Sequence, residues 1–274
     1  TRENSRFTVS ATATHQPFEW LTQRLVIGTD VSQEKNEILF PRHPDGAQHD
    51  FLGLSLGMIQ VEKPLTRYNT FDYGISARFN RGDNMTFTTS FGAQYYDRFE
   101  EVIAAEGRVF PSPAIKTLGG AASTTSSSTQ VQNKSVGMYV QQELSLNDRV
   151  FLTAAVRGDD NSAFGKEYDA AIYPKLSAAW VISEEPFWQW THIANSVRLR
   201  GAWGKAGRQP DTFAATTLFA PRTGPGGSPA LTPDLLGNPE LGPEVSSELE
   251  VGFDAAFLDD RISTQVTFYH QKVK

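Results

Sequence analysis

Cysteine is absent from this chain of 274 residues, which excludes disulfide bonds and thiolate metal sites. Long apolar runs are absent as well: no stretch reaches 18 residues, so the sequence contains no candidate transmembrane helix. Positive charge is in the minority, with 25 Lys and Arg residues against 31 Asp and Glu residues. The net charge of −6 and the lack of a basic stripe argue against a nucleic-acid partner.

The strongest positive signal is alternating hydrophobicity. Apolar and polar residues alternate over residues 71–80, and the alternation restarts over residues 85–96 after a turn at 81–84. A period of two places successive side chains on opposite faces of a strand. Runs of about 10 residues are longer than the strands of most soluble sheets and match a tilted crossing of a bilayer. The pattern therefore predicts transmembrane β-strands.

The same pattern recurs along the chain and predicts about ten membrane strands. They are expected near residues 5–14, 20–32, 71–80, 85–96, 136–144, 150–159, 171–182, 197–203, 249–257 and 262–268. A possible extra strand at 52–61 ends before Pro64. Residues 99–134 are expected to form a long loop whose low-complexity tract, 123–129, is mobile. A Pro/Gly-rich loop is expected over 207–245, and a connection with Trp188 and Trp190 over 183–194.

The connections alternate in length. Short turns are expected near Gln16, Gly82, Asp148 and Asp260, and long stretches near Asp45, Thr124, Asn161 and Gly226. Outer-membrane barrels join their strands by short periplasmic turns and long external loops. The order therefore favours an all-β, antiparallel transmembrane barrel. A soluble β-sandwich or propeller remains the alternative, since both also contain alternating strands.

Several stretches resemble the SusC/RagA-type TonB-dependent outer-membrane proteins, and their order and spacing also match. The resemblance is clear over residues 137–274 and looser before them. The stretches that carry it are Arg157-Gly158-Asp159-Asp160-Asn161-Ser162-Ala163-Phe164-Gly165, Tyr173-Pro174-Lys175-Leu176-Ser177, Trp180-Val181-Ile182-Ser183, residues 197–207, Asn238-Pro239-Glu240-Leu241-Gly242-Pro243-Glu244, residues 248–254 and residues 261–269.

The resemblance implies a barrel of roughly 22 strands whose lumen is closed by an N-terminal plug. It implies nutrient import driven through TonB, together with a surface lipoprotein of SusD type that covers the barrel. It places the protein in the outer membrane of a Gram-negative bacterium, in contact with lipid and lipopolysaccharide. We expect residues 1–274 to be one internal piece of a single barrel domain, with the plug and the barrel C-terminus outside this chain.

Charged residues on the polar faces of the strands are the candidate site residues. A charge that faces lipid at mid-depth costs roughly 2–4 kcal/mol, so these side chains are expected to face the lumen. There they would contact substrate or plug, or form a wall network that only solvates the lumen. These lumen-facing candidates are Arg157, Asp159, Arg198, Arg200, Glu248, Glu250 and Asp254.

Other chemical signals are weak. The residues His43, Asp45, His49 and Asp50 have metal-ligand chemistry, but no helix or hairpin fixes their geometry, and solvated loop residues explain them. The tripeptide 81–83, Arg-Gly-Asp, resembles an integrin-type adhesion motif, but Gly and Asp are the residues that a tight turn requires.

No catalytic signature and no phosphate-binding glycine loop occur, so no catalytic, cofactor or metal residue is predicted. The tryptophans near strand ends fit interfacial aromatic girdles.

The sequence is interpreted as part of a SusC-type importer that takes up an oligomeric nutrient, glycan or peptide, with a lipoprotein lid. It is not expected to be an enzyme. The first alternative is a siderophore or cobalamin receptor of the same fold, and the second is a structural or adhesive outer-membrane barrel.

Overall fold

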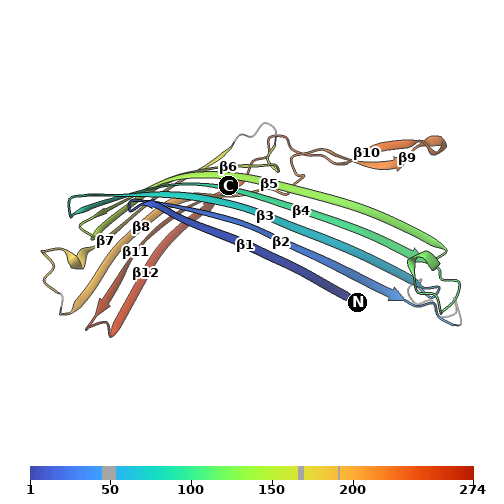
Figure 1. Ribbon diagram of the computed structural model, residues 1–274, viewed down its shortest axis with the longest axis horizontal. Coiled ribbons are helices and arrows are strands. Elements are labelled where there is room, and N and C mark those ends of the chain that lie inside the picture. Colours follow the sequence, from blue (N-terminus) through green and yellow to red (C-terminus); the bar gives the residue numbers. More distant parts are fainter. Residues whose placement is uncertain (45–53, 166–169, 191) are drawn as a thin grey trace. The chain divides into compact units, whose positions relative to one another are not determined.

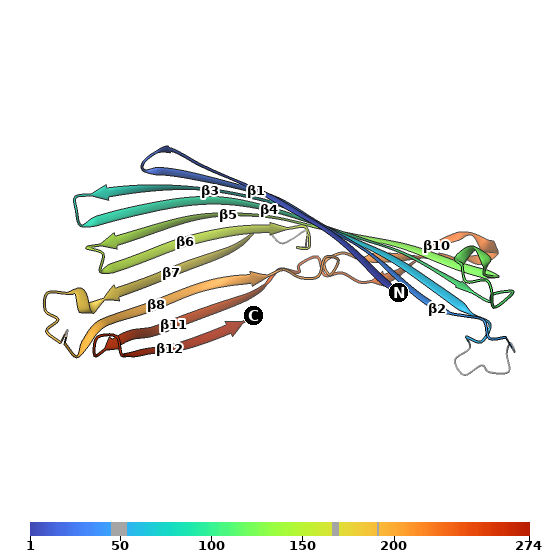
Figure 2. The same ribbon diagram turned by 60° about the horizontal axis from the view of Figure 1, so that its bottom comes forward.

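The computed structural model describes residues 1–44, 54–165, 170–190 and 192–274. Its main element is a ten-stranded sheet with the strand order β1-β2-β3-β4-β5-β6-β7-β8-β11-β12 (Figures 1 and 2). The strands of this sheet are β1 (Arg2–Phe18), β2 (Leu21–Phe40), β3 (Met58–Arg81), β4 (Met85–Arg108), β5 (Ser123–Leu146), β6 (Val150–Asn161), β7 (Ala171–Val181), β8 (Ala194–Arg208), β11 (Glu244–Phe257) and β12 (Ile262–Val273).

The remaining elements are short. Strands β9 (Leu218–Thr223) and β10 (Pro229–Leu235) form a separate antiparallel hairpin between β8 and β11. The described residues also contain three 3-10 turns, η2 (Leu118–Gly120), η3 (Ile182–Glu184) and η4 (Pro225–Gly227). The predicted count of ten membrane strands agrees with the ten strands of the main sheet. The sandwich and propeller alternatives are wrong, because these ten strands form one sheet rather than two packed sheets or separate blades.

The chain divides into two compact units. Unit 1 comprises residues 1–11, 27–70 and 96–133, and unit 2 comprises residues 12–26, 71–95 and 134–274. Unit 1 contains a small core in which Phe110 is fully buried, together with Met58 and Ile59. The Arg42 guanidinium donates to the carbonyl oxygen of Phe110 at 2.8 Å, so the β2–β3 connection is held against the β4–β5 connection.

The predicted short turns are confirmed. Gly82 has a φ of 63°, in the left-handed region that glycine adopts without steric penalty. The next turn uses Asn147 and Asp148 with φ of 51° and 54°, and the last one places Asp260 at 64°. Asn and Asp tolerate this conformation better than most residues, which explains why these turns could be read from sequence. The first turn comes slightly later than expected, because β1 continues through Pro17 to Phe18.

The expected long loop over residues 99–134 is wrong. Strand β4 continues to Arg108 and β5 begins at Ser123, so each is 24 residues long. Two side-chain hydrogen bonds join the strands in this region: Gln132 to Asp97 at 2.8 Å and Gln130 to Glu101 at 2.6 Å. Polar residues on both faces hide the alternation there, but a strand with water on both faces needs no apolar side chain.

Two further boundaries differ from the prediction. Residues 52 and 53 lie outside the described part of the chain, but β3 begins at Met58 and continues through Pro64, so no separate strand ends before that proline. A proline removes only one backbone donor, which a strand of 24 residues tolerates. The loop expected over residues 207–245 contains the β9–β10 hairpin.

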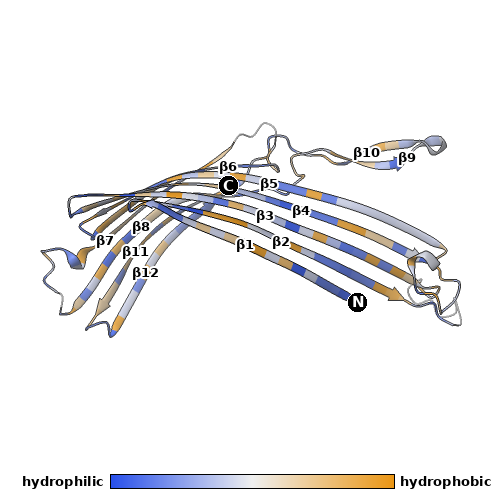
Figure 3. Cartoon of the chain, in the orientation of Figure 1, coloured by the Kyte–Doolittle hydropathy of each residue, from blue (hydrophilic) through white to orange (hydrophobic). Residues whose placement is uncertain are grey.

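The pairing register of β8 and β11 confirms that the side chains of these strands in unit 2 divide into two faces, as predicted. Phe253 pairs with Leu199, whereas Asp254 pairs with Arg198. Figure 3 shows the resulting alternation of hydrophobic and hydrophilic bands along the strands. We call the first set the apolar face, and its members include Leu152, Val156, Leu199, Val251 and Phe253, which are 37–52% exposed. Such a continuous exposed apolar surface is rare in soluble monomers. The opposite side of unit 2 is called the polar face.

Candidate functional site

The centre of the polar face is a cluster of two arginines and one carboxylate. Arg198 and Arg200 lie on β8, and Asp254 lies on the neighbouring strand β11. The Arg198 Nη2 donates to Asp254 Oδ2 at 2.7 Å, and the Arg200 Nε donates to Asp254 Oδ1 at 3.3 Å. Arg200 also donates to Thr267 on β12. One carboxylate therefore accepts from two guanidinium groups, which leaves one positive charge in excess within the cluster.

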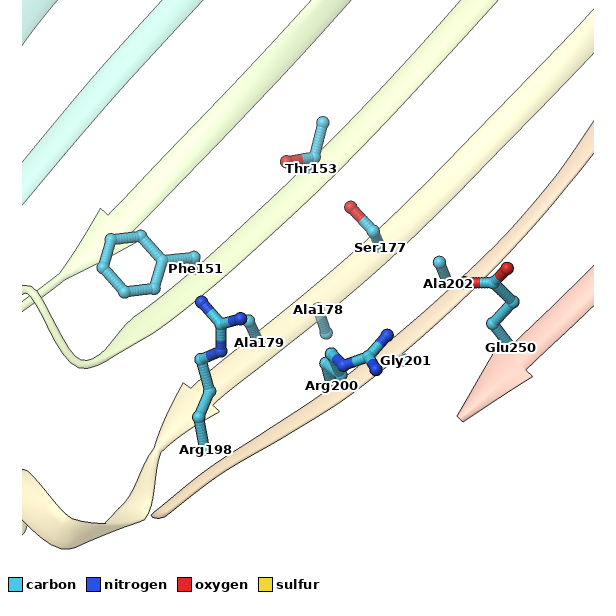
Figure 4. Close-up of a pocket in the computed structure, with 10 residues that line it drawn as sticks. All are labelled: Phe151, Thr153, Ser177, Ala178, Ala179, Arg198, Arg200, Gly201, Ala202 and Glu250. Carbon is cyan, nitrogen blue, oxygen red and sulfur yellow. The ribbon is translucent and has the colours of Figure 1, made fainter. Parts of the chain in front are cut away.

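A shallow pocket opens beside this cluster. It has a volume of about 290 Å³ and is lined by ten residues, including Arg198, Arg200 and Glu250 (Figure 4). Small side chains at Ser177, Ala179 and Ala202 leave this space open. Glu250 adds a negative charge that offsets the excess of the cluster. Glu248 is two residues earlier on β11, so alternation places it on the same face.

A second polar network begins on β6. The Arg157 Nε donates to both carboxylate oxygens of Asp159, at 2.9 and 2.8 Å. Its Nη2 reaches Gln94 Oε1 on β4 at 2.9 Å, and Gln94 in turn donates to Asp72 on β3 at 2.6 Å. Arg157 crosses β5 at Gly137, where a Cβ atom would come within 2.3 Å of the guanidinium Nη2. The glycine therefore provides the space through which strands β3 to β6 are connected.

The two networks are not brought together by the fold. Arg157 pairs with Tyr173 on β7, whereas Arg198 pairs with Val181 on the same strand. The two positions on β7, 173 and 181, are eight residues apart, which corresponds to roughly 26 Å at about 3.3 Å per residue. The seven predicted residues therefore do not form one compact site.

A larger depression lies mainly on the apolar face. Its volume is about 550 Å³, and its lining includes Leu152, Leu176, Trp203 and Val251. A depression with this lining suits acyl chains rather than a polar substrate.

Aromatic side chains gather at the short turns of unit 2. The rings of Phe18 and Trp20 stack at 5.4 Å, and Trp20 stacks on Phe79 at 5.2 Å. In the β7–β8 connection, Trp188 donates to the carbonyl oxygen of Ala194 at 3.1 Å and packs against Trp190. Such clusters at strand ends are typical of an interfacial girdle. Among the described residues, no helix is long and apolar enough to span a membrane.

The described residues contain no group of three or more His, Cys, Asp or Glu side chains that could hold a metal ion. His43 is part of the described chain, but Asp45, His49 and Asp50 lie outside the described residues.

Sequence reasoning missed an aromatic and charged cluster in unit 1. The rings of Tyr68 and Tyr96 lie 5.8 Å apart, and the Arg98 guanidinium lies 5.9 Å from the Tyr68 ring. Arg98 donates to Glu100 on the same strand at 3.0 Å, and Arg6 pairs with Asp30 nearby. The interpretation of 99–134 as a loop excluded the cluster, because residues 95–101 have polar side chains on both faces and give no signal that β4 continues.

Two of the stretches that carry the family resemblance, residues 157–165 and 238–244, are far apart in the sequence but in contact in the structure. The Gly165 N–H donates to the Leu241 carbonyl oxygen at 2.9 Å. Asn161, which is 6% exposed, accepts from the backbone N–H of Ala163 at 2.8 Å and donates to Gln209 at 2.5 Å. The β6–β7 connection is thereby bonded to both ends of the segment between β8 and β11.

Comparison with known proteins identifies the family. All residues, 1–274, match the family described as TonB dependent receptor-like, beta-barrel. The chain belongs to this family. It is a barrel segment of the outer membrane that is similar to SusC and to RagAB, and the predicted fold class is confirmed.

Two curated relatives illustrate the similarity. TonB-dependent receptor P26 from Formosa agariphila is 31% identical over 135 residues, which cover 46% of this chain and 13% of the relative. TonB-dependent receptor SusC from Bacteroides thetaiotaomicron is 27% identical over 149 residues, which cover 52% of this chain and 15% of the relative. The chain therefore spans only a small part of these relatives.

Solved structures share the fold. The RagAB peptide importer in its closed-closed state matches with a TM-score of 0.90 at 19% identity, over 99% of this chain and 30% of that chain. The ferric-catecholate import receptor Fiu from E. coli K12, in its closed form, matches with a TM-score of 0.61 at 12% identity, over 99% of this chain and 41% of that chain.

Proposed function

We propose that the protein to which this chain belongs imports an oligomeric nutrient, glycan or peptide, across the outer membrane. A surface lipoprotein of SusD type covers the barrel, and TonB supplies the energy. We also propose that residues 1–274 form one continuous part of a single barrel, whose plug lies elsewhere in the full-length protein. The observation that carries the proposal is the match of 99% of the chain to the RagAB peptide importer with a TM-score of 0.90.

The charge of the polar face also supports this class of cargo. Asp254 and Glu250 offset Arg198 and Arg200, and Asp159 and Asp72 more than offset Arg157. A wall whose carboxylates equal or outnumber its arginines does not attract anions. It suits an uncharged or mixed-charge oligomer better than an anionic ferric chelate.

The lower match to Fiu keeps the siderophore receptor as the second candidate. The discriminating experiment is gentle purification of the full-length protein from its native membrane, followed by uptake assays in cells with and without TonB. The proposal predicts a co-purifying lipoprotein and TonB-dependent uptake of fluorescent oligosaccharides or oligopeptides. Isolation without a lipoprotein, with uptake of a labelled ferric chelate only, would establish the siderophore receptor instead. A barrel that takes up none of these probes would support the structural or adhesive role.

A further inference from the structure

Strand β5 has an unpaired edge along its first half. It pairs with β6 only from Ser135, opposite Asn161, to Leu146, opposite Val150. One residue earlier, the Lys134 carbonyl oxygen accepts from the Ser162 N–H at 2.9 Å. Across the described residues, no strand pairs with residues 123–132 on the β6 side. We call residues 123–132 the free edge.

The direction of the backbone groups along the free edge follows from Lys134. Its N–H donates to Ser162 Oγ and its C=O accepts from the Ser162 N–H, so both groups point toward the β6 side. Successive residues of a strand turn these groups to opposite sides. The residues that present N–H and C=O to the open side are therefore Thr124, Ser126, Ser128, Gln130 and Gln132.

The free edge lacks the features that usually protect exposed strands. Natural sheets block their edges with lysine, proline, bulges or covering elements. Residues 123–132 contain no proline and no charged residue, and seven consecutive positions, 123–129, are Ser or Thr. Small hydroxyl side chains leave the backbone open to a second strand, and the hydrogen bonds from Gln130 and Gln132 to β4 hold the edge extended.

We propose that the free edge binds an extended peptide by strand addition, so that the imported oligomer is a peptide rather than a glycan. This inference rests on the proposed function as an importer. An importer of peptides with mixed sequences needs contacts that all of them share, and those are the backbone N–H and C=O groups. An oligosaccharide has no regular series of amide donors and acceptors to match the edge.

The face of the sheet beside the free edge also has a pocket, but it lies over the paired side of β5. Its volume is about 390 Å³, and Thr125, Ser126 and Ser127 form part of its lining, together with Gln60, Glu62 and Glu106 of β3 and β4. A peptide added to β5 would lie on the other side of that strand, with its side chains pointing alternately to the two faces of the sheet. The proposed affinity therefore comes from the backbone of the free edge and not from this pocket.

The test uses the full-length protein, purified with any lipoprotein that accompanies it. The probe is a fluorescent ten-residue peptide of Ala, Ser and Thr, and its twin is N-methylated at every residue, so that neither of its edges keeps a row of donors. Methylation removes donors without altering the side chains. The twin is expected to bind the wild-type protein at least about tenfold more weakly, since several backbone hydrogen bonds are lost. Equal binding of the two peptides would overturn the inference.

Variants locate the site. Changing Ser126→Pro together with Ser128→Pro removes two donors from the open side and leaves the bonds to β4 in place. The expected result is about tenfold weaker peptide binding. The matched control, Ser126→Ala with Ser128→Ala, keeps both donors and should bind as the wild type does. Peptide binding that the proline variant retains in full would place the site elsewhere.

The outcomes separate this inference from the proposed function. If the wild type takes up maltoheptaose but no peptide, the peptide assignment is wrong and oligomer import stands. Uptake of a ferric chelate alone would overturn both. A cysteine placed at Ser128 that cross-links to the lipoprotein, and is not shielded by added peptide, would assign the edge to the lipoprotein and overturn the inference.

Discussion

The backbone N–H of Gly165 donates to the carbonyl oxygen of Leu241 at 2.9 Å, although the two residues belong to connections 76 positions apart in the sequence. Gly165 follows β6, and Leu241 precedes β11. A Cβ atom at position 165 would lie 1.9 Å from the carbonyl oxygen of Pro239, so no other residue fits without movement of the backbone. This contact joins two of the stretches that carry the family resemblance.

The first prediction concerns this contact. Replacing Gly165→Ala should separate the two connections and destabilise the region by about 1–3 kcal/mol, the usual range for overpacking. Limited proteolysis of the full-length protein should then cut residues 209–243 faster than in the wild type. Gly119→Ala is the matched control, because a Cβ atom there meets nothing within 4 Å. Equal cleavage rates for the two variants would contradict the packing argument.

The second prediction concerns sidedness. The connections near Ser126, Asn161 and Gly226 should lie outside the cell, and those at Asp148 and Asp260 should face the periplasm, as in barrels with short periplasmic turns. Cysteines at Ser126 and Gly226 should react with an impermeant maleimide on intact cells, whereas Asp148→Cys should react only after lysis. Asn161 is 6% exposed and is a poor labelling site. Labelling of Asp148→Cys from outside would reverse the orientation.

The third prediction concerns the two faces of unit 2. Val251→Arg should impair assembly, because an arginine that faces lipid near mid-depth costs roughly 2–4 kcal/mol. Ser177→Arg lies in the pocket of the polar face, close to Glu250, and should assemble normally. Heat-modifiable migration in gels measures the folded fraction. If both variants fold equally well, the apolar face does not contact lipid.

The fourth prediction concerns the shared carboxylate. Asp254→Asn removes the charge that separates Arg198 from Arg200, so the two guanidinium groups repel each other. The effect on the free energy of unfolding should be small, since Arg198 is half exposed and solvent screens the interaction. A double-mutant cycle with Arg198→Gln should give a positive coupling energy in thermal unfolding. The variant Asp259→Asn, in an exposed turn, serves as control. A coupling energy of zero would mean that the ion pair between Arg198 and Asp254 does not contribute to stability.

Local patterns in the sequence determined where strands occur and which residues share a face. The period of two is a property of neighbouring residues. It alone predicts that the side chains of Leu199 and Arg200 point to opposite faces, and that those of Glu250 and Asp254 point to the same face. The turns at Gly82, Asp148 and Asp260 were also readable, because their left-handed backbone restricts the residue type. Membership of the barrel family followed from several such elements in order.

Only the tertiary structure decided the strand ends and the partners. Residues 123–132 have no apolar alternation, and they form a strand because β4 supplies the opposing hydrogen bonds. The pairing of Arg198 with Asp254, 56 residues later, and the bond from Arg157 to Gln94 across β5 depend on register. Register is set by contacts between segments that are distant along the chain, and periodicity within one strand carries no information about it.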